Sequence, residues 1–392
     1  MRKGWEYKKL GEVCDVINGY AFKSSKYTSQ GTRIIRITNV QKGYVVDNDP
    51  KFYSDEDFKD LFQYSLFEGD LVMSLTGNVG RVGILQKNML PAALNQRVAC
   101  LRVKSKKMQL NYLFHLLNSN LFENAAIQSA RGIAQLNMST EWLKNYIIPL
   151  PPLSTQLAIV SELDKINELI RLKKEQLKDF DNLAQSLFYE MFGDPVENEK
   201  GWEAKKLGEI GEFKNGLNFS KDENGHSIKF LGVSDFQNKK SIASDQLDCI
   251  SLSECVQEDY LLKTGDIVFV RSNGKKELIG RSVKMYITEP TTYSGFCIRC
   301  RITDEKVDKD YIAILLKTPI IRQFMTNSGR GCNISNLNQK VLNSIPTILP
   351  PLPLQRLFAQ RIEQIEREKS EVQKSIQDLE TLLASRMQYW FE

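Results

Sequence analysis

Residues 151–195 read PPLSTQLAIVSELDKINELIRLKKEQLKDFDNLAQSLFYEMFGDP. Apolar residues recur there at alternating spacings of four and three, the a/d pattern of helices that pair in coiled coils. The pattern predicts one long helix that Gly193 and Pro195 bring to an end. We call its apolar stripe the seam, which consists of Ile159, Leu163, Ile166, Ile170, Leu177, Phe180 and Leu187. A lone helix would leave this seam in water, so a partner helix is expected.

The partner lies at the other end of the chain. Pro350-Pro351-Leu352 repeats Pro151-Pro152-Leu153, and a second seam follows it. That seam consists of Phe358, Ile362, Ile365, Val372, Ile376, Leu379 and Leu383. We expect the two helices to pair as an intramolecular antiparallel coiled coil. Exchange of helices between two chains would satisfy the same pattern.

The repeat extends beyond the helices. Residues 4–12, GWEYKKLGE, return as residues 201–209, GWEAKKLGE. Asn18-Gly19 returns as Asn215-Gly216, and Gly69-Asp70 as Gly265-Asp266. The chain is therefore expected to contain two homologous domains and two helices with pseudo-two-fold symmetry. The bounds drawn from the repeat are 1–150 for domain one, 151–195 for the central helix, 196–349 for domain two and 350–392 for the C-terminal helix.

Each domain is expected to be mixed α/β. Short β-branched runs predict strands, and apolar spacing predicts one helix over 112–130 and another over 311–327. A length of 392 residues suits two domains. The net charge of +5 permits nucleic-acid binding without requiring it.

The composition also bears on location. No apolar run approaches the ~18 residues of a membrane span, and no signal peptide is expected. Seven irregularly spaced cysteines fit free thiols in a reducing cytoplasm.

Polar loops that follow strand-like segments supply candidate DNA contacts. Arginine and lysine can bond guanine, and asparagine and glutamine can bond adenine, in the major groove. The first loop is 74–81, and its expected counterpart is 271–276. The candidates are Thr76, Asn78, Arg81, Asn95, Gln96, Arg97 and Arg131 in domain one, and Arg271, Asn273, Lys275, Lys276 and Arg330 in domain two. The alternative is a set of solvated turns with incidental charges.

Catalytic and metal-binding patterns are not found. The sequence holds no phosphate-binding glycine loop and no dinucleotide fingerprint. Its only histidines are His115 and His226. Cys297 and Cys300 stand three apart on a predicted strand, so their sulfurs should point to opposite faces rather than share a zinc ion. No catalytic residue, metal ligand or cofactor is expected in this chain.

In its order of motifs the chain resembles the specificity (S) subunit of type I restriction-modification systems. The resemblance covers essentially the whole chain and rests on the GWE-x-x-K-L-G-E opening, the Gly-Asp strand starts, the P-P-L-x-x-Q helix starts and the M-F-G-D-P end at 191–195. It implies two target-recognition domains that read a gapped, two-part sequence in double-stranded DNA. It also implies docking of two methyltransferase (modification) subunits and of restriction subunits with translocase activity. S-adenosylmethionine, ATP and magnesium would then belong to those partners.

Two other functions remain open on the sequence. One is a coiled-coil scaffold that joins two protein ligands without touching DNA. Such binding should be insensitive to salt, whereas phosphate contacts weaken as salt rises. The other is an enzyme with an unrecognised site, which would show turnover by the chain alone.

Overall fold

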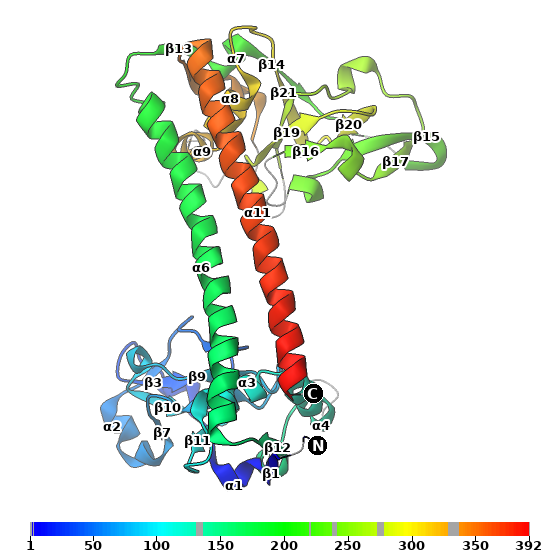
Figure 1. The fold of residues 1–392 in the computed structure, drawn as a ribbon. Coiled ribbons are helices and arrows are strands. Elements are labelled where there is room, and N and C mark those ends of the chain that lie inside the picture. Colours follow the sequence, from blue (N-terminus) through cyan, green and yellow to red (C-terminus); the bar gives the residue numbers. More distant parts are fainter. Residues whose placement is uncertain are drawn as a thin grey trace. The chain divides into compact units, whose positions relative to one another are not determined.

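The computed structural model describes Arg2 and residues 4–130, 136–218, 221–236, 241–272, 278–327 and 337–391, without the side chains of 221–224. The chain divides into two compact units. The first comprises Met1–Glu175 with Gln373–Glu392, and the second comprises Gln176–Val372. Each unit combines one mixed α/β domain with segments of both long helices (Figure 1).

The two long helices are α6 (Leu153–Phe192) and α11 (Leu352–Phe391), drawn in green and in orange to red in Figure 1. They run antiparallel within each unit. In the first unit Glu162 pairs with Arg386, and Lys174 Nζ lies 2.8 Å from Glu380 Oε1. In the second unit Lys369 Nζ lies 2.5 Å from Asp181 Oδ1. The antiparallel pairing within one chain confirms the expectation from the two seams.

Seam residues lie between the helices and the domains. All those named from the sequence are buried or half-buried. The helix ends go further and enter the domain cores, where Phe391 packs against Tyr112 with ring centroids 5.7 Å apart. Phe192 stands 5.1 Å from Tyr311 in the same way. Each domain core is therefore completed by the C-terminal end of one long helix.

Domain one contains three β-structures besides a short hairpin. The outer pair is β1 (Glu6–Lys9) with β12 (Ile147–Leu150). The main antiparallel sheet has the order β2 (Cys14–Asn18), β11 (Val98–Val103), β8 (Leu71–Ser74), β9 (Val82–Ile84). The second sheet has the order β6 (Phe52–Tyr53), β3 (Thr32–Ile35), β10 (Ala92–Leu94), β7 (Ser65–Leu66), and the hairpin is β4 (Val40–Gln41) with β5 (Tyr44–Val45). Its helices are α1 (Leu10–Val13), α2 (Asp55–Phe58), α3 (Leu110–Leu117), α4 (Asn120–Ser129) and α5 (Thr140–Asn145).

Domain two repeats this plan. Its outer pair is β13 (Glu203–Lys206) with β22 (Pro346–Leu349). The main sheet has the order β14 (Gly211–Asn215), β21 (Cys297–Ile302), β18 (Ile267–Val270), β19 (Ser282–Tyr286), β16 (Ser241–Ala243). The second sheet is β17 (Cys249–Leu252), β15 (Lys221–Leu231), β20 (Thr291–Tyr293). Its helices are α7 (Leu207–Ile210), α8 (Lys309–Leu315), α9 (Pro319–Asn327) and α10 (Gln339–Asn343).

The main sheet of each domain is buried on both faces. In β8, Leu71 and Met73 pack against the helices, whereas Val72 packs with residues of the second sheet. In β18, Ile267 and Phe269 belong to the helix-side core, and Val268 to the core on the opposite face. Because successive side chains alternate between faces, a strand buried on both sides reads as a continuous apolar run.

The single helices expected over 112–130 and 311–327 are each broken in two. Ser119 caps α4 by accepting a hydrogen bond from Phe122 N at 3.3 Å, which competes with continuation of α3. In domain two the break falls at Pro319, whose ring fits a first helical turn but not a helix interior. The expectation of one helix was therefore wrong in both domains, because a residue that favours the start of a new helix stands at each break.

Candidate nucleic-acid interface

Four segments of domain one meet at one place, which we call the loop junction. They are the residues around Tyr20, the loop 75–81, the turn 95–97 and residues 136–138. Gln96 N donates to Tyr20 O at 2.8 Å, and Leu75 N donates to Arg97 O at 2.9 Å. Met138 N in turn donates to Leu75 O at 2.8 Å. Segments from four parts of the sequence are thereby fixed to one another by backbone bonds.

Domain two has the same junction. Gly295 N donates to Leu217 O, and Arg271 N donates to Phe296 O, both at 2.8 Å. Leu337 N donates to Arg271 O at 2.8 Å. The three bonds match those of domain one in order and direction. The residues of domain two at the positions of Tyr20, Leu75, Gln96, Arg97 and Met138 are therefore, in that order, Leu217, Arg271, Gly295, Phe296 and Leu337.

The repeated Asn-Gly dipeptide is explained by this junction. A Cβ on Gly19 would stand 2.1 Å from Asn95 O, and one on Gly216 would stand 2.1 Å from Ser294 O. No side chain can occupy either position without moving the neighbouring turn. Glycine is needed here because two backbones approach closely.

The candidates on the loop 75–81 have different surroundings. Thr76 is 8 % exposed, and its hydroxyl donates to Asn137 Oδ1 at 2.9 Å, so it ties the loop to residues 136–138. Arg81 is half-buried, and its Nη1 donates to Gln41 Oε1 at 2.9 Å. Asn78 is exposed. Thr76 therefore helps to hold the loop in shape, and Asn78 is the candidate on this loop whose side chain is most accessible to a ligand.

In the turn 95–97 one residue holds the turn in shape and the other two have exposed side chains. Asn95 is half-buried, and its Oδ1 accepts a hydrogen bond from Arg97 N at 3.2 Å, which holds the turn closed. Gln96 and Arg97 are exposed. The structure thus brings Gln96, Arg97 and the loop 75–81 together at one junction, as the Leu75–Arg97 bond shows.

Five other candidates cannot be placed in this way. Arg131, Asn273, Lys275, Lys276 and Arg330 lie outside the described residues. Arg271 is described and half-buried, and it takes the position of the buried Leu75 rather than that of an exposed loop residue.

Sequence reasoning missed Arg281. Val270 N donates to Arg281 O at 2.9 Å, just as Ser74 N donates to Arg81 O at 2.9 Å. Arg281 is therefore the counterpart of Arg81, and the loop in domain two extends beyond the expected 271–276. The repeated Gly80-Arg81 and Gly280-Arg281 dipeptides are the signal that could have revealed it.

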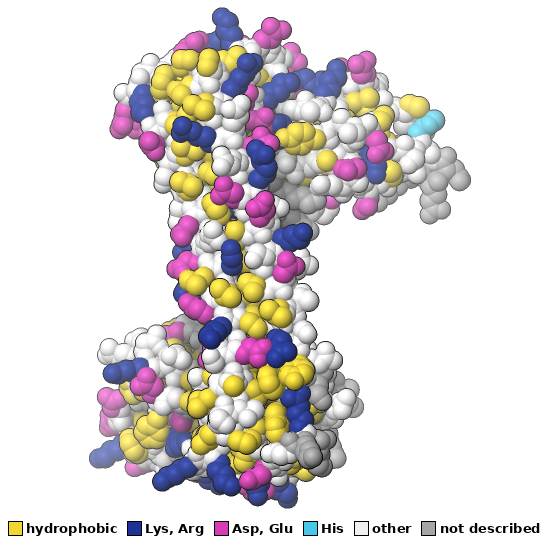
Figure 2. Space-filling view, in the orientation of Figure 1, with side chains coloured by type: hydrophobic (Ala, Val, Ile, Leu, Met, Phe, Trp, Pro, Cys, Tyr) yellow, Lys and Arg dark blue, Asp and Glu magenta, His cyan; other side chains and the backbone are white. Residues whose placement is uncertain are grey.

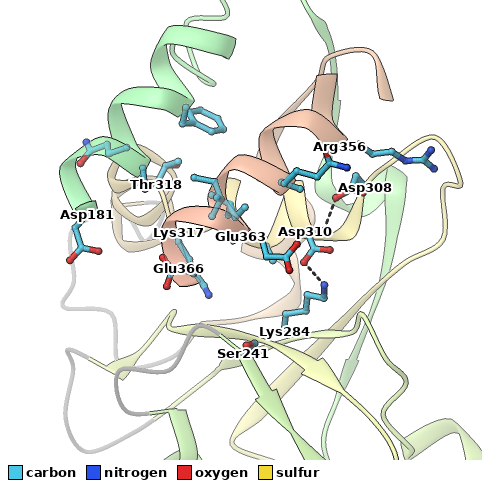
Figure 3. Close-up of a pocket in the computed structure, with 18 of the residues that line it drawn as sticks. Asp181, Ser241, Lys284, Asp308, Asp310, Lys317, Thr318, Arg356, Glu363 and Glu366 are labelled. Atoms are coloured by element: carbon cyan, nitrogen blue, oxygen red, sulfur yellow. Dashed lines mark hydrogen bonds and ion pairs between the residues drawn. The ribbon is translucent and has the colours of Figure 1, made fainter. Parts of the chain in front are cut away.

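The second unit also contains a cavity of about 740 Å³, lined by α6, α8, α11 and β19 residues (Figure 3). Lys284 in this cavity pairs with Asp310. Burial is the largest single influence on the Lys284 ammonium and lowers its pKa, but the hydrogen bonds and charges of Asp310 and Tyr286 together outweigh burial, and the pKa is raised. Asp308 accepts from Asp310 N and Tyr311 N, both at 3.0 Å, as the N-cap of α8. These charged groups thus hold the start of α8 against β19.

Cysteine and histidine side chains are placed inside the domains. Cys297 packs in one core of domain two and Cys300 in the other, which confirms that they point to opposite faces of β21. Burial raises the pKa of both thiols to about 12. His115 is buried, with Nε2 2.7 Å from Asp164 Oδ1 on α6. Within the part of the chain that the structure describes, no cluster of three or more His, Cys, Asp or Glu could hold a metal.

None of the described helices is both long enough and apolar enough to cross a bilayer.

Comparison with known proteins identifies the fold and the family. Residues 2–179 and 199–381 each match the family described as type I restriction modification DNA specificity domain. The type I restriction enzyme StySPI specificity subunit of Salmonella potsdam is 23 % identical over 98 % of this chain and 87 % of its own length. The EcoKI specificity subunit of Escherichia coli K12 is 22 % identical over 95 % of this chain and 84 % of its own length.

Solved structures show the same fold. A chain solved in work on complex assembly and conformational transition of the type I R-M system aligns with a TM-score of 0.65 and 19 % identity, over 100 % of this chain and 98 % of that one. The S subunit from M. genitalium aligns with a TM-score of 0.52 and 16 % identity, over 98 % of this chain and 95 % of its own. With two matched copies of the specificity domain spanning most of its length, this chain belongs to the specificity subunits of type I restriction-modification systems, which recognise DNA.

Proposed function

We propose that each domain reads one half of a gapped target in double-stranded DNA through its loop junction. The observation that carries this proposal is the matched junction itself. The same three backbone bonds recur in both domains, whereas the exposed side chains of Gln96 and Arg97 are replaced by a half-buried Gly295 and an exposed Phe296. A conserved frame with different presented groups suits two sites that read different bases.

Within this proposal the domain bounds are 1–150 and 196–349, with the helices over 151–195 and 350–392. The contacts in domain one come from Asn78, Arg81, Gln96 and Arg97, and the unplaced Arg131 joins them. In domain two Arg271, Arg281 and the unplaced Asn273, Lys275, Lys276 and Arg330 serve the same purpose. Thr76 and Asn95 hold the loops in shape.

The long helices supply docking surfaces for other subunits. Leu157, Leu169 and Leu172 on α6 are each about half exposed in the first unit, as are Leu183 and Leu357 in the second. Figure 2 shows hydrophobic side chains interspersed with charged ones along these helices. Repeated exposed leucines on rigid helices favour a protein partner. We infer that two adenine methyltransferase subunits dock there and that restriction subunits join that core in the cytoplasm.

The chain would then contribute recognition and no chemistry of its own. S-adenosylmethionine would bind to the methyltransferase subunits, and ATP and magnesium to the restriction subunits. Strand separation, base modification and cleavage are therefore assigned to partners, and this chain decides where on the DNA they act.

Methylation mapping tests the proposal. DNA from cells that contain the methyltransferase subunit is compared with and without this chain. We expect a gapped motif, modified on both strands, that disappears when this chain is absent. Methylation independent of this chain would contradict the proposal and favour the scaffold without a DNA role.

Domain exchange tests the modular assignment. Residues 1–150 are replaced by the corresponding domain of another specificity subunit, with residues 196–349 exchanged in a matched second variant. Each variant should change only one half of the motif. Simultaneous change of both halves in either variant would show that the domains do not read separately.

Affinity at increasing salt separates DNA recognition from protein scaffolding. Binding through phosphates releases counterions, so the logarithm of the affinity should fall linearly with the logarithm of the salt concentration. An affinity for the methylated motif that does not change with salt would argue against phosphate contacts.

A further inference from the structure

In both turns, 95–97 and 294–296, the side chain of the first residue holds the backbone of the third. Asn95 Oδ1 accepts from Arg97 N at 3.2 Å, and Ser294 Oγ accepts from Phe296 N at 3.2 Å. The first residue of each turn thus uses its own side chain to fix the third. A different polar group performs the same task in each domain.

The side chain at the third position is presented outward in both turns. Arg97 is exposed, and Phe296 is 59 % exposed. The Phe296 carbonyl is nevertheless held, because it accepts from Arg271 N at 2.8 Å and from Ser272 N at 3.4 Å. The backbone is therefore fixed while the ring is left in water. The backbone bonds of the turn are thus shared by the two domains, whereas the exposed side chain at its third position differs.

An exposed phenylalanine is not needed to build this turn. Its bonds come from Ser294 and the backbone, and any polar residue at 296 would leave them intact. Burying a phenylalanine side chain typically stabilises a protein, and Phe296 forgoes most of that gain in the free chain. Contact with an apolar group on a ligand recovers it.

We propose that Arg97 and Phe296 are the matched reading positions of the two half-sites, with Arg97 contacting a guanine and Phe296 contacting the 5-methyl group of a thymine. In the major groove the thymine methyl is the apolar feature of the base edges, and guanine presents two acceptors that suit arginine. The inference rests on the proposed function, since it assumes that the loop junctions face DNA.

Deoxyuridine provides the test, because it lacks only the 5-methyl group of thymidine. The full chain, assembled with its methyltransferase subunit, is titrated with its own gapped target. Each thymine of the second half-site is replaced singly by deoxyuridine. At one position we expect binding to weaken about fourfold, the loss that follows from one methyl-sized apolar contact.

Two variants assign that loss to Phe296. Phe296→Ala should bind the thymine and deoxyuridine targets equally, whereas Phe296→Leu should keep part of the difference. Arg97→Ala is the matched control, since it should weaken dependence on a guanine of the first half-site and leave the thymine-to-deoxyuridine ratio unchanged.

Three outcomes would overturn this assignment while leaving the proposed function in place. One is a second half-site without thymine, and another is a ratio that Phe296→Ala does not alter. The third is weaker binding by Phe296→Ala with no effect of deoxyuridine, which would indicate insertion of the ring between bases. Failure of the wild-type assembly to bind any gapped target would instead refute the proposed function itself.

Discussion

Gln355 Oε1 accepts a hydrogen bond from Asp308 N at 2.9 Å, which ties the start of α11 to the start of α8. Gln355 Nε2 also donates to Pro350 O at 2.7 Å. Gln156 repeats the arrangement in the first unit, with Oε1 2.9 Å from Gln109 N and Nε2 2.8 Å from Pro151 O. Each glutamine is almost wholly buried. The glutamine of the P-P-L-x-x-Q motif therefore joins each long helix to the domain that precedes it.

Replacing either glutamine should destabilise its unit. Gln156→Ala or Gln355→Ala leaves buried backbone groups without partners, at a cost of about 1–3 kcal/mol in the free energy of unfolding for such a group. Urea denaturation measures the change. Gln373→Ala, at an exposed position of α11, is the control and should be close to neutral. Equal stability of all three variants would contradict the role given to the buried amides.

Filling the close approach at the junction should disrupt recognition in one domain. Gly216→Ala places a methyl group 2.1 Å from Ser294 O, so the turn 294–296 must move. We expect a loss of about 1–3 kcal/mol in stability, typical of overpacking, and weaker reading of the second half-site. Gly232→Ala is the control, because its nearest neighbour would be an ordinary 3.5 Å away. A variant that bound the whole target like the wild type would show that the turn does not need this approach.

The arginine found only from the structure should contribute to phosphate or base contact. Arg281→Ala should lower the slope of log affinity against log salt by about 1 if its guanidinium meets a phosphate. Arg281→Lys should restore most of that slope because it keeps the charge. Arg367→Ala on α11, where Arg367 pairs with Glu363, is the matched control. An unchanged slope and an unchanged motif for Arg281→Ala would remove this residue from the interface.

The thiols of domain two should differ in reactivity with iodoacetamide at pH 8. Cys249 and Cys255 are exposed and should be alkylated in the native protein. Burial raises the pKa of Cys297 and Cys300 to about 12, so both stay neutral and unreactive. Peptide mapping by mass spectrometry follows each site, and denaturant should make all of them react. Alkylation of Cys297 in the native chain at the rate of Cys249 would contradict the packing described here.

The same raised pKa values set the direction of a pH effect. The folded state holds the thiol protons more tightly than the unfolded state does. Stability from these groups is therefore complete below the ordinary thiol pKa of 9.0 and is lost as the pH rises toward about 12.

Glu162 should stabilise the pairing of α6 with the end of α11. Its carboxylate accepts from Arg386, and its Oε2 accepts from Trp390 Nε1 at 2.9 Å. The hydrogen bond from Arg386 is the main cause that lowers the pKa of Glu162. A lowered pKa gives stability that is present above the ordinary value of 4.5 and is lost as the pH falls through the folded value.

Glu162→Gln measures this contribution. At pH 7 we expect a loss of about 0.5–1 kcal/mol, within the range for a partly exposed ion pair. The difference from wild type should shrink as the pH falls below 4.5, where the wild-type carboxyl becomes protonated. Asp378→Asn, on an exposed position of α11, serves as the control. A difference that grew toward low pH would reverse the sign given to this interaction.

The sequence by itself determined the two long helices, the duplication and the family. Seam residues such as Ile159 and Phe358 can be predicted from the sequence, because helical spacing brings them to one face of the helix whatever surrounds them. The repeated Asn-Gly and Gly-Asp dipeptides likewise marked equivalent turns, since backbone geometry limits which residues fit there. The opposite facing of Cys297 and Cys300 followed from strand alternation alone.

Only the tertiary structure decided which polar residues support the loops and which are presented. Thr76 and Asn95 share the composition of a DNA contact, yet their side chains bond Asn137 and Arg97 N. Backbone bonds between distant segments establish the correspondence of Arg281 with Arg81 and of Phe296 with Arg97. Loop residues lack a periodic pattern, because their environment is set by segments far apart in the chain and not by their neighbours in sequence.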